Sequence, residues 1–356
     1  MSASERQAAP PQNSLGLATM HPASFALVMA TGIVSIACEI LDHPLLARAL
    51  LWANLTFYVV LWSLTVARIV RFPERVLADI SHHGRSVGFF TIVAATCVVG
   101  SQMLVINDAW RTAAAFWAFG ILLWAVVTYT VFTALTVKGE KPPLAEGING
   151  GWLVSVVAAQ SVAVLGSQLA PGFDVHVPQV LFFCLGMWLG GGMLYIWIIS
   201  LIFYRYTFFV MSPSDLAPPY WINMGAVAIS TLAGATLIEA APDSRLLQDL
   251  LPFLKGFTLL FWATATWWIP MLVILGAWRH VYRRFPLGYD PLYWGAVFPL
   301  GMYTVCTFRL AGAIDAPYLL IIPRVFLYIA LAAWGATMIG ALRLLVRHSR
   351  VVLSPN

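Results

Sequence analysis

Ten long apolar stretches follow one another along the chain, and short polar gaps separate them. A helix needs about 20 mostly apolar residues to cross the hydrocarbon core of a bilayer. We therefore predict transmembrane helices over residues 22–40, 46–69, 86–106, 112–137, 152–170, 177–203, 219–239, 252–278, 291–312 and 317–346. Short connections favour antiparallel neighbours, so we expect an all-α membrane protein built from five helical hairpins.

The predicted organisation is a single membrane domain, residues 21–346, between two short tails. Residues 1–20 are polar and mixed, and the first apolar stretch is too long for the core of a signal peptide. We therefore expect a disordered cytoplasmic N-terminal tail and a retained first helix. Residues 347–356 are expected to form a short cytoplasmic C-terminal tail.

Composition and charge support a membrane protein with a defined orientation. The chain is 60% hydrophobic and 10% charged, whereas soluble domains carry roughly 25% charged residues. Of its 20 Lys and Arg residues, 14 lie in the two tails and the even-numbered gaps. Because positive residues stay in the cytoplasm, we expect both termini to be cytoplasmic. This placement explains the net charge of +5, so we expect no binding to nucleic acid.

The odd-numbered and even-numbered stretches differ in side-chain size. The odd-numbered ones begin with aromatic residues and continue with glycine, alanine and hydroxyl residues, as in residues 220–231 and 293–304. The even-numbered ones are bulky, as around Trp267 and Trp268. A repeat of about 65 residues would explain this, although aromatic ends and small contact residues are also general features of membrane helices. Five slim helices around a central pore, inside five bulky ones, satisfy both patterns.

The residues that carry enzymatic or metal chemistry are scattered. The seven histidines lie in gaps or at the ends of stretches, and Cys38, Cys97, Cys184 and Cys306 lie in four different stretches. No catalytic or metal-binding spacing is present, so we predict no enzyme, no metal site and no cofactor. Asp, Glu and Lys are missing from the centres of the stretches, which disfavours a dedicated proton relay.

An uncharged path lined by hydroxyls and accessible backbone suits a small anion, because such groups bind weakly enough for release. The same residue types also let helices pack closely, so each candidate has two interpretations. The candidate path residues are Phe25, Thr31, Gly32, Phe90, Thr96, Ser161, Gly225, Ser230, Pro299, Gly301 and Thr304.

Phe298 is a large ring on a stretch of mostly small residues, directly before Pro299. A hydrophobic constriction can gate a channel, so Phe298 is a candidate pore gate. The alternative is an aromatic side chain that packs beside a proline kink.

Several segments resemble the tellurite-resistance/dicarboxylate transporter (TDT) family, which is related in fold to TehA and the plant slow anion channels. They are His21-Pro22, Phe25, residues 28–32, 88–90, 220–230, 267–270 and 278–279, and above all residues 293–303, Tyr-Trp-Gly-Ala-Val-Phe-Pro-Leu-Gly-Met-Tyr. The resemblance covers residues 20–346. It implies five hairpins around a pore, a homotrimer, and a pore-occluding phenylalanine that matches Phe298. It also implies transport of malate and related dicarboxylates, sulfite, chloride or nitrate, with tellurite resistance as a phenotype.

We therefore expect a multi-pass protein of the plasma (inner) membrane that transports small anions, with four-carbon dicarboxylates such as malate favoured. Its expected partners are small anions, the lipid bilayer and two further copies of the chain. Two alternatives remain open: a proton-coupled secondary carrier, and an efflux protein or channel for inorganic anions.

Overall fold

The computed structural model describes the backbone of residues 16–353 and the side chains of residues 16–347. Most of the expected N-terminal tail lies outside the described residues. Its last part is ordered, because Leu17–Thr19 form the 3₁₀ turn η1. At the other end, the last helix continues to Leu353, into the region expected to be a tail.

The described chain is helical and contains nine segments that are long and apolar enough to cross a membrane. The long helices are α1 (Ala26–Ile40), α2 (Pro44–Arg71), α4 (Phe90–Asn107), α5 (Trp110–Val137), α7 (Val154–Leu169), α8 (Val177–Phe208), α9 (Ile222–Glu239), α11 (Leu251–Ala277), α12 (Trp294–Ala313) and α13 (Ile321–Leu353). The count of nine differs from the predicted ten at the 59-residue segment Gly150–Phe208. That segment contains both α7 and α8, joined by η5 (Ala170–His176), in which Asp174 has a non-helical φ of 48°.

Short helices occupy the connections. They are α3 (Pro73–Ile80), α6 (Leu144–Gly147), η7 (Ala241–Asp243), α10 (Arg245–Asp249), the π-helical η8 (Trp278–Tyr282) and η10 (Pro317–Leu320).

Five helices begin in the same way, with a 3₁₀ turn directly before the α-helix. These opening turns are η2 (Pro22–Phe25), η3 (Ser86–Phe89), η4 (Gly150–Leu153), η6 (Pro218–Trp221) and η9 (Pro291–Tyr293). They precede α1, α4, α7, α9 and α12. Three of them have proline in the first turn, where its fixed φ suits a helix start and its missing N–H costs no bond. The aromatic starts of the odd-numbered stretches thus share one local structure.

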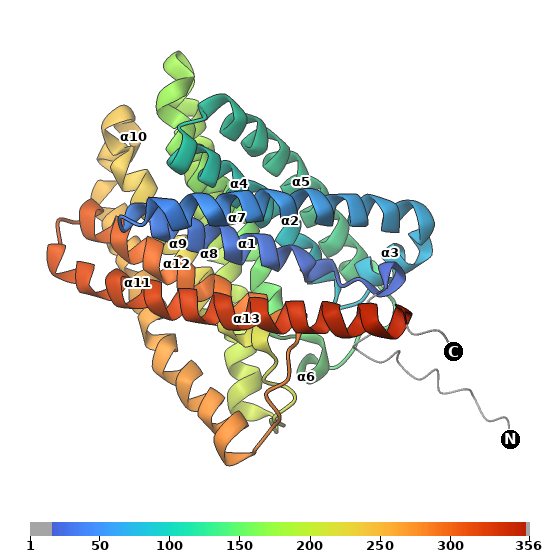
Figure 1. Ribbon diagram of the computed structural model, residues 1–356. Coiled ribbons are helices and arrows are strands. Elements are labelled where there is room, and N and C mark those ends of the chain that lie inside the picture. The colour runs from blue at the N-terminus through green and yellow to red at the C-terminus, as the bar shows by residue number, and fades with distance from the viewer. Residues whose placement is uncertain (1–15, 354–356) are drawn as a thin grey trace, which may run out of the picture.

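These same five helices form the centre of the molecule, as their small residues predict. Each central helix contacts the next in the closed order α1, α4, α7, α9, α12 and back to α1. They are more deeply buried than α2, α5, α8, α11 and α13, which we call the peripheral helices. In the most apolar 18-residue stretch of each helix, 94% of residues are buried in α9 and 11% in α13. Each central helix packs on the peripheral helix that follows it, and Figure 1 shows α2 and α13 lying across the front of the bundle.

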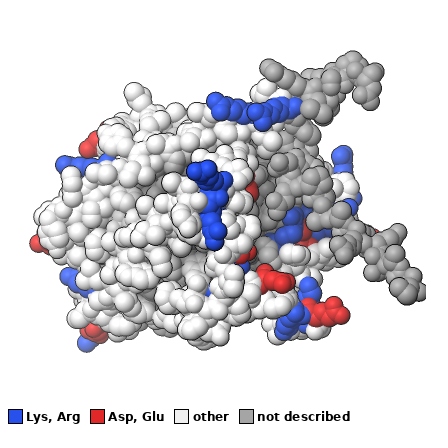
Figure 2. Space-filling view, turned by 90° about the horizontal axis from the view of Figure 1, so that it is seen from below, with Lys and Arg blue, Asp and Glu red and all other residues white. Residues whose placement is uncertain are grey.

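The peripheral helices present large apolar side chains to the surroundings. Val60, Leu122, Trp197, Leu260 and Val325 are each about half exposed or more. In Figure 2 most of the visible face carries no charged side chain. A surface of this kind is stable against acyl chains and not in water, so the fold is that of a multi-pass membrane protein.

The opening turns touch one another closely, and Gly150 shows how closely. A Cβ atom on Gly150 would lie 2.3 Å from the carbonyl oxygen of Pro219 and 2.8 Å from Cα of Tyr220. Both are backbone atoms of η6, so a side chain there has to push η4 and η6 apart.

We therefore expect Gly150→Val to destabilise the fold by more than about 2 kcal/mol. The measurement is the monodisperse fraction and melting temperature of the detergent-purified protein. Gly139→Val is the matched control, because nothing lies within 4 Å of a Cβ at Gly139. Equal behaviour of the two variants would contradict this packing.

Candidate functional site

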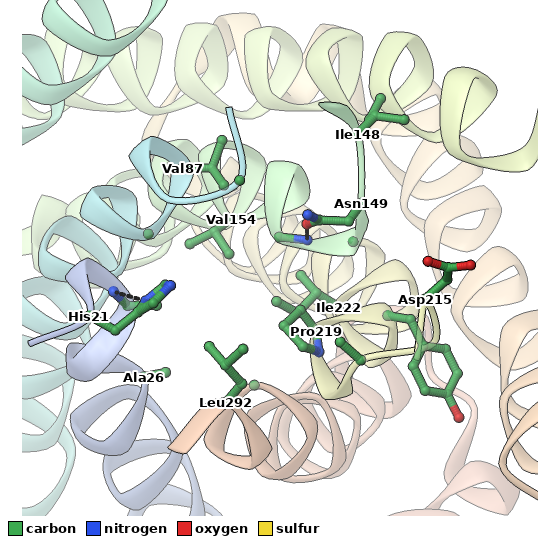
Figure 3. A pocket seen from close by; sticks show the side chains of 18 of the residues that line it. His21, Ala26, Val87, Ile148, Asn149, Val154, Asp215, Pro219, Ile222 and Leu292 are labelled. Carbon is green, nitrogen blue, oxygen red and sulfur yellow. Dashed lines mark hydrogen bonds between the residues drawn. The ribbon is translucent and has the colours of Figure 1, made fainter. Parts of the chain in front are cut away.

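A cavity of about 430 Å³, the vestibule, lies where the five opening turns meet. Each turn or the helix after it contributes lining residues, including Ala26, Gly88, Val154, Ile222 and Gly295. Figure 3 shows residues from all five elements arranged around one open centre. The helices therefore point their N-terminal ends, which carry partial positive charge and free N–H groups, at a common space.

Arg205, near the end of α8, brings a buried positive charge to the vestibule. The residue is only 8% exposed and lines the cavity. Its Nη2 atom lies 3.5 Å from Oδ1 of Asp215, which is longer than a hydrogen bond requires. Its Nε atom is buried with no partner in the described structure. A guanidinium with unused donors beside a cavity is suited to an oxyanion.

The segment that follows α8 is held at the rim of the vestibule. Asp215 accepts hydrogen bonds from the backbone N–H and hydroxyl of Ser212, both at 2.8 Å, and the Nη1 atom of Arg279 donates to the carbonyl of Leu216. Burial raises the pKa of Asp215, but the Ser212 bonds and the charge of Arg205 outweigh it and leave that pKa below its ordinary value. Asp215 is therefore ionised and partly balances Arg205.

His21 lies on the opposite wall of the vestibule, directly before η2 (Figure 3). Its Nδ1 atom accepts a hydrogen bond from the N–H of Ala23 at 3.0 Å, so it caps the opening turn. Burial, followed by the nearby charge of Arg85, lowers the pKa of His21 to about 4. The ring is therefore neutral at physiological pH.

This geometry predicts an acid-dependent loss of stability. The unfolded chain binds a proton at His21 near pH 6.5, whereas the folded chain does so only near pH 4. Stability therefore falls as pH drops from about 6.5 to 4, by roughly 1–2 kcal/mol at pH 5. We expect His21→Asn, in which the Asn Oδ1 atom takes the capping role of Nδ1, to lose less melting temperature between pH 7 and pH 5 than the wild type. An identical drop in both proteins would refute this.

A buried ion cluster ties the N-terminal segment to the same end of the molecule. Asp79 of α3 lies between two arginines, 2.7 Å from Arg68 Nη2 and 2.5 Å from Arg85 Nε. Burial raises the pKa of Asp79. The hydrogen bonds and charges of Arg85 and Arg68 have the larger, opposite effect, so the pKa lies below its ordinary value. The same guanidinium groups approach the carbonyls of Ala18 and Met20 at 3.4 Å. Two cations and one anion leave net positive charge beside the vestibule.

One face of α12 leads inward from the vestibule. Gly295 lines the vestibule, and Met302, Val305 and Arg309 line a second space of only about 20 Å³, the narrow cavity. Steps of three and four residues connect these positions, which places Phe298 on the same helical face between the two spaces. Phe298 is 2% exposed. A space of this size holds about one water molecule.

The walls of the narrow cavity are mainly apolar. Ile33, Val98, Ile229 and Met302 line it from four central helices. Its polar lining residues are Ser101, Ser161, Gln168 and Arg309. The centre of the passage is therefore a hydrophobic constriction with polar groups toward one side.

A third space, the far cavity, has a volume of about 270 Å³ and lies at the C-terminal ends of α4, α7, α9 and α12. Gln168 and Arg309 line both it and the narrow cavity. The far cavity also contains Glu239, whose carboxylate lies 3.3 Å from Nη1 of Arg309. The three spaces thus follow one another along the central helices.

Several candidate path residues lie toward the peripheral helices. Phe25 packs edge-on against Tyr58 and Trp62 of α2, and Phe90 lies against Phe132 of α5. Thr31 accepts a hydrogen bond from Trp334 Nε1 of α13, and Thr96 is hydrogen-bonded to the Tyr58 hydroxyl, both at 3.0 Å. Of the candidates, only Ser161 lines one of the three cavities described above.

The other hydroxyls bond within their own helices. Ser230 donates to the carbonyl of Ala226 at 2.8 Å, and Thr304 donates to that of Leu300 at 3.0 Å. A hydroxyl bonded four residues back satisfies itself locally. Its hydrogen-bonding capacity as a donor is therefore met without an anion.

The candidate glycines mark close helix contacts. A Cβ on Gly32 would lie 2.4 Å from Val98, one on Gly225 would lie 2.7 Å from Pro299, and one on Gly301 would lie 2.8 Å from Ile33. These glycines and Pro299 thus let α1, α4, α9 and α12 approach one another.

Most residues that line the three cavities carry no signal in the sequence that would have identified them. Arg205 lies just beyond the predicted helix 177–203 and Arg309 near the end of the predicted helix 291–312; neither was a candidate, and neither were Ile33, Val98, Ile229 and Met302. The one available signal was the spacing of three and four residues from Gly295 through Phe298 to Arg309. Among residues 16–347, no three His, Cys, Asp or Glu side chains gather as a metal site requires, and the four cysteines are unpaired.

Comparison with known proteins gives consistent matches along the chain. The sequence profile of the SLAC1 family, described as voltage-dependent anion channel, matches residues 19–342. An uncharacterised membrane protein of Mycobacterium tuberculosis is 40% identical over 149 residues, which are 42% of this chain and 75% of that protein. An uncharacterised transporter of Methanocaldococcus jannaschii is 26% identical over 294 residues, covering 80% of this chain and 82% of the relative. A sulfite efflux pump of Trichophyton rubrum is 21% identical over 344 residues, covering 90% and 89%.

Proposed function

Because this chain belongs to the SLAC1 family of voltage-dependent anion channels, we propose that it carries small anions across the plasma (inner) membrane along the axis of its five central helices. The observation that carries the proposal is the convergence of five opening turns on one vestibule. Five helix N-termini and the buried Arg205 favour an anion there, against the carboxylates of Asp215 and Glu146 on the same lining. The narrow and far cavities continue the route.

We propose ten membrane crossings in five hairpins, with both termini and the vestibule on the cytoplasmic side. The break at η5 supports two crossings in the 59-residue segment. The basic residues Arg68, Arg85, Arg205 and Arg279 all lie at the vestibule end, as the excess of cytoplasmic positive charge requires. The homotrimer remains a proposal, which rests on the family resemblance alone.

Phe298 is the proposed gate. Its ring lies on the face of α12 that runs from the vestibule to the narrow cavity, where the passage has room for about one water molecule. An apolar closure opposes ion passage because an anion there loses hydration without gaining partners. Rotation of this one ring opens the route without any charge moving.

Malate is the substrate that the sequence resemblance favours, and its two carboxylates suit Arg205 and the helix N-termini. Sulfite is the second candidate, supported by the sulfite efflux pumps that match 90% of this chain. Purified protein in liposomes, assayed with labelled malate, succinate, sulfite, chloride and tellurite, distinguishes them. Flux of one or more of these anions above that of empty liposomes supports the proposal. Absence of flux for the whole panel overturns it.

The same liposomes test the coupled carrier. A pH gradient is imposed while the membrane potential is clamped near zero with potassium and valinomycin. A gated channel equilibrates the anion, whereas a proton-coupled carrier accumulates it against its gradient. Uphill accumulation would replace the channel by the carrier in this proposal.

A further inference from the structure

We infer that Arg309 forms a second anion-binding site at the far end of the passage, and that Glu239 occupies this site when no anion is bound. The inference deepens the proposed function and rests on it. It concerns a site distinct from the vestibule and from Phe298, because Arg309 lies three helical turns beyond Phe298 on α12.

The position of Arg309 is the first support. Among the described residues 16–347, it is the only basic one that lines the narrow and far cavities, and it lines both of them. It continues the face of α12 that carries Phe298, eleven residues on, or about 16 Å at the rise of an α-helix. An anion that has passed Phe298 therefore meets this guanidinium before it reaches the far cavity.

The second support is an unpartnered group beside it. Gln168 of α7 lines the same two cavities, and its Oε1 atom is buried without a hydrogen-bond partner. The NH₂ end of this amide is not among the buried unpartnered atoms, so it is the end that the cavities can reach. A guanidinium and an amide at the junction of two cavities together offer several N–H donors to one oxyanion.

Glu239 accounts for the closed arrangement. Its carboxylate lies 3.3 Å from Nη1 of Arg309, and both side chains are about one-third exposed. A pair this exposed contributes little stability, so it exchanges readily with a competing anion. The carboxylate has the chemistry of the proposed substrates, and it keeps the guanidinium from holding one of them so tightly that release becomes slow.

The test compares Arg309→Gln, Glu239→Gln and the double variant in proteoliposomes, with sulfite and malate as probes. The readout is the concentration that gives half-maximal initial flux. Arg309→Gln is expected to raise this concentration about tenfold, the effect of one lost charge-assisted hydrogen bond. Glu239→Gln is expected to lower it, and the double variant to behave like Arg309→Gln. Arg309→Lys, which keeps the charge, is expected to restore part of the affinity.

Two controls separate the site from general effects. Asp243→Asn removes a negative charge from the same cavity without touching an ion pair, so it should lower the half-maximal concentration less than Glu239→Gln. Arg111→Gln removes an exposed positive charge at the same end of the molecule and should have no effect.

The direction of the shifts decides the outcome. A purely structural ion pair predicts that Arg309→Gln and Glu239→Gln harm flux alike, and that result would overturn the inference while leaving the proposed function intact. Equal effects of Arg309→Gln and Arg111→Gln would overturn it too. Absence of sulfite and malate flux in the wild type would overturn the site together with these two substrates.

Discussion

Phe298→Ala is expected to raise anion flux through the reconstituted protein by about tenfold or more. Phe298 is buried and lies on the face of α12 between Gly295 of the vestibule and Met302 of the narrow cavity, where we propose the gate. Replacing it with a methyl group opens space on the axis and removes an apolar barrier, and a barrier lowered by about 1.4 kcal/mol raises a rate tenfold. The measurement is single-channel or macroscopic current in planar bilayers, together with liposome flux.

Phe90→Ala is the matched control for this gate. Phe90 is fully buried, as Phe298 is, but its ring lies against Phe132 of the peripheral helix α5. Its removal leaves a cavity away from the axis, which costs stability and opens no path. Wild-type current in the Phe298→Ala protein at normal expression would contradict the gate. An equal rise in Phe90→Ala would show that loosened packing is sufficient.

Arg205→Gln is expected to raise the anion concentration that gives half-maximal flux about ten- to hundredfold. Hydrogen bonds to a charged group contribute about 1.5–3 kcal/mol, and the guanidinium of Arg205 lines the vestibule with only a 3.5 Å contact to Asp215. The maximal flux should change less, because the constriction lies deeper. The measurement is the dependence of initial flux on anion concentration on the vestibule side.

Two further variants test the role of Arg205. Arg71→Gln removes an exposed arginine three residues after Arg68, at the end of α2, and should change little. Asp215→Asn leaves Arg205 in place without its weak partner at 3.5 Å, so it should increase apparent affinity. A loss of affinity in Asp215→Asn as large as in Arg205→Gln would mean that the pair only holds the rim segment in place.

The arrangement of the helices could be predicted from the sequence because each helix is marked by a long stretch of residues. Stretches of about 20 apolar residues locate the helices, and the contrast between small residues in 220–231 and bulky ones around Trp267 separates the central from the peripheral helices. The 59-residue segment shows where length alone is ambiguous, since only the unusual backbone at Asp174 separates α7 from α8.

The lining of the passage was not predictable from residue type. The central helices are buried on all sides, so α9 has no polar face to indicate the axis. Threonine and serine were expected to face the path, but Thr31 and Thr96 bond to side chains of peripheral helices and Ser230 bonds within its own helix. The residues that do line the narrow cavity, such as Ile33 and Val98, look like ordinary core residues.

Arg205 and Arg309 could not be predicted as lining residues for a different reason. Their backbones lie at helix ends, as the charge pattern indicated, but their side chains are long enough to reach a cavity. Arg205 is buried although it sits in the last turn of α8, and Arg309 lies on the face of α12 that carries Phe298. Only the three-dimensional arrangement shows which basic residues line the cavities.

The central claim, that anions pass along the axis between the central helices, is tested most directly by cysteine labelling at Met302. The experiment uses Met302→Cys in a Phe298→Ala background, with Cys97 replaced by serine because it also lines the narrow cavity. A negatively charged methanethiosulfonate added at the vestibule side should block the current, and the permeant anion should slow that block. Val325→Cys on the exposed face of α13 serves as the control. Full current after exposure of Met302→Cys to the reagent, or equal block at Val325→Cys, would contradict a route through the centre of the bundle.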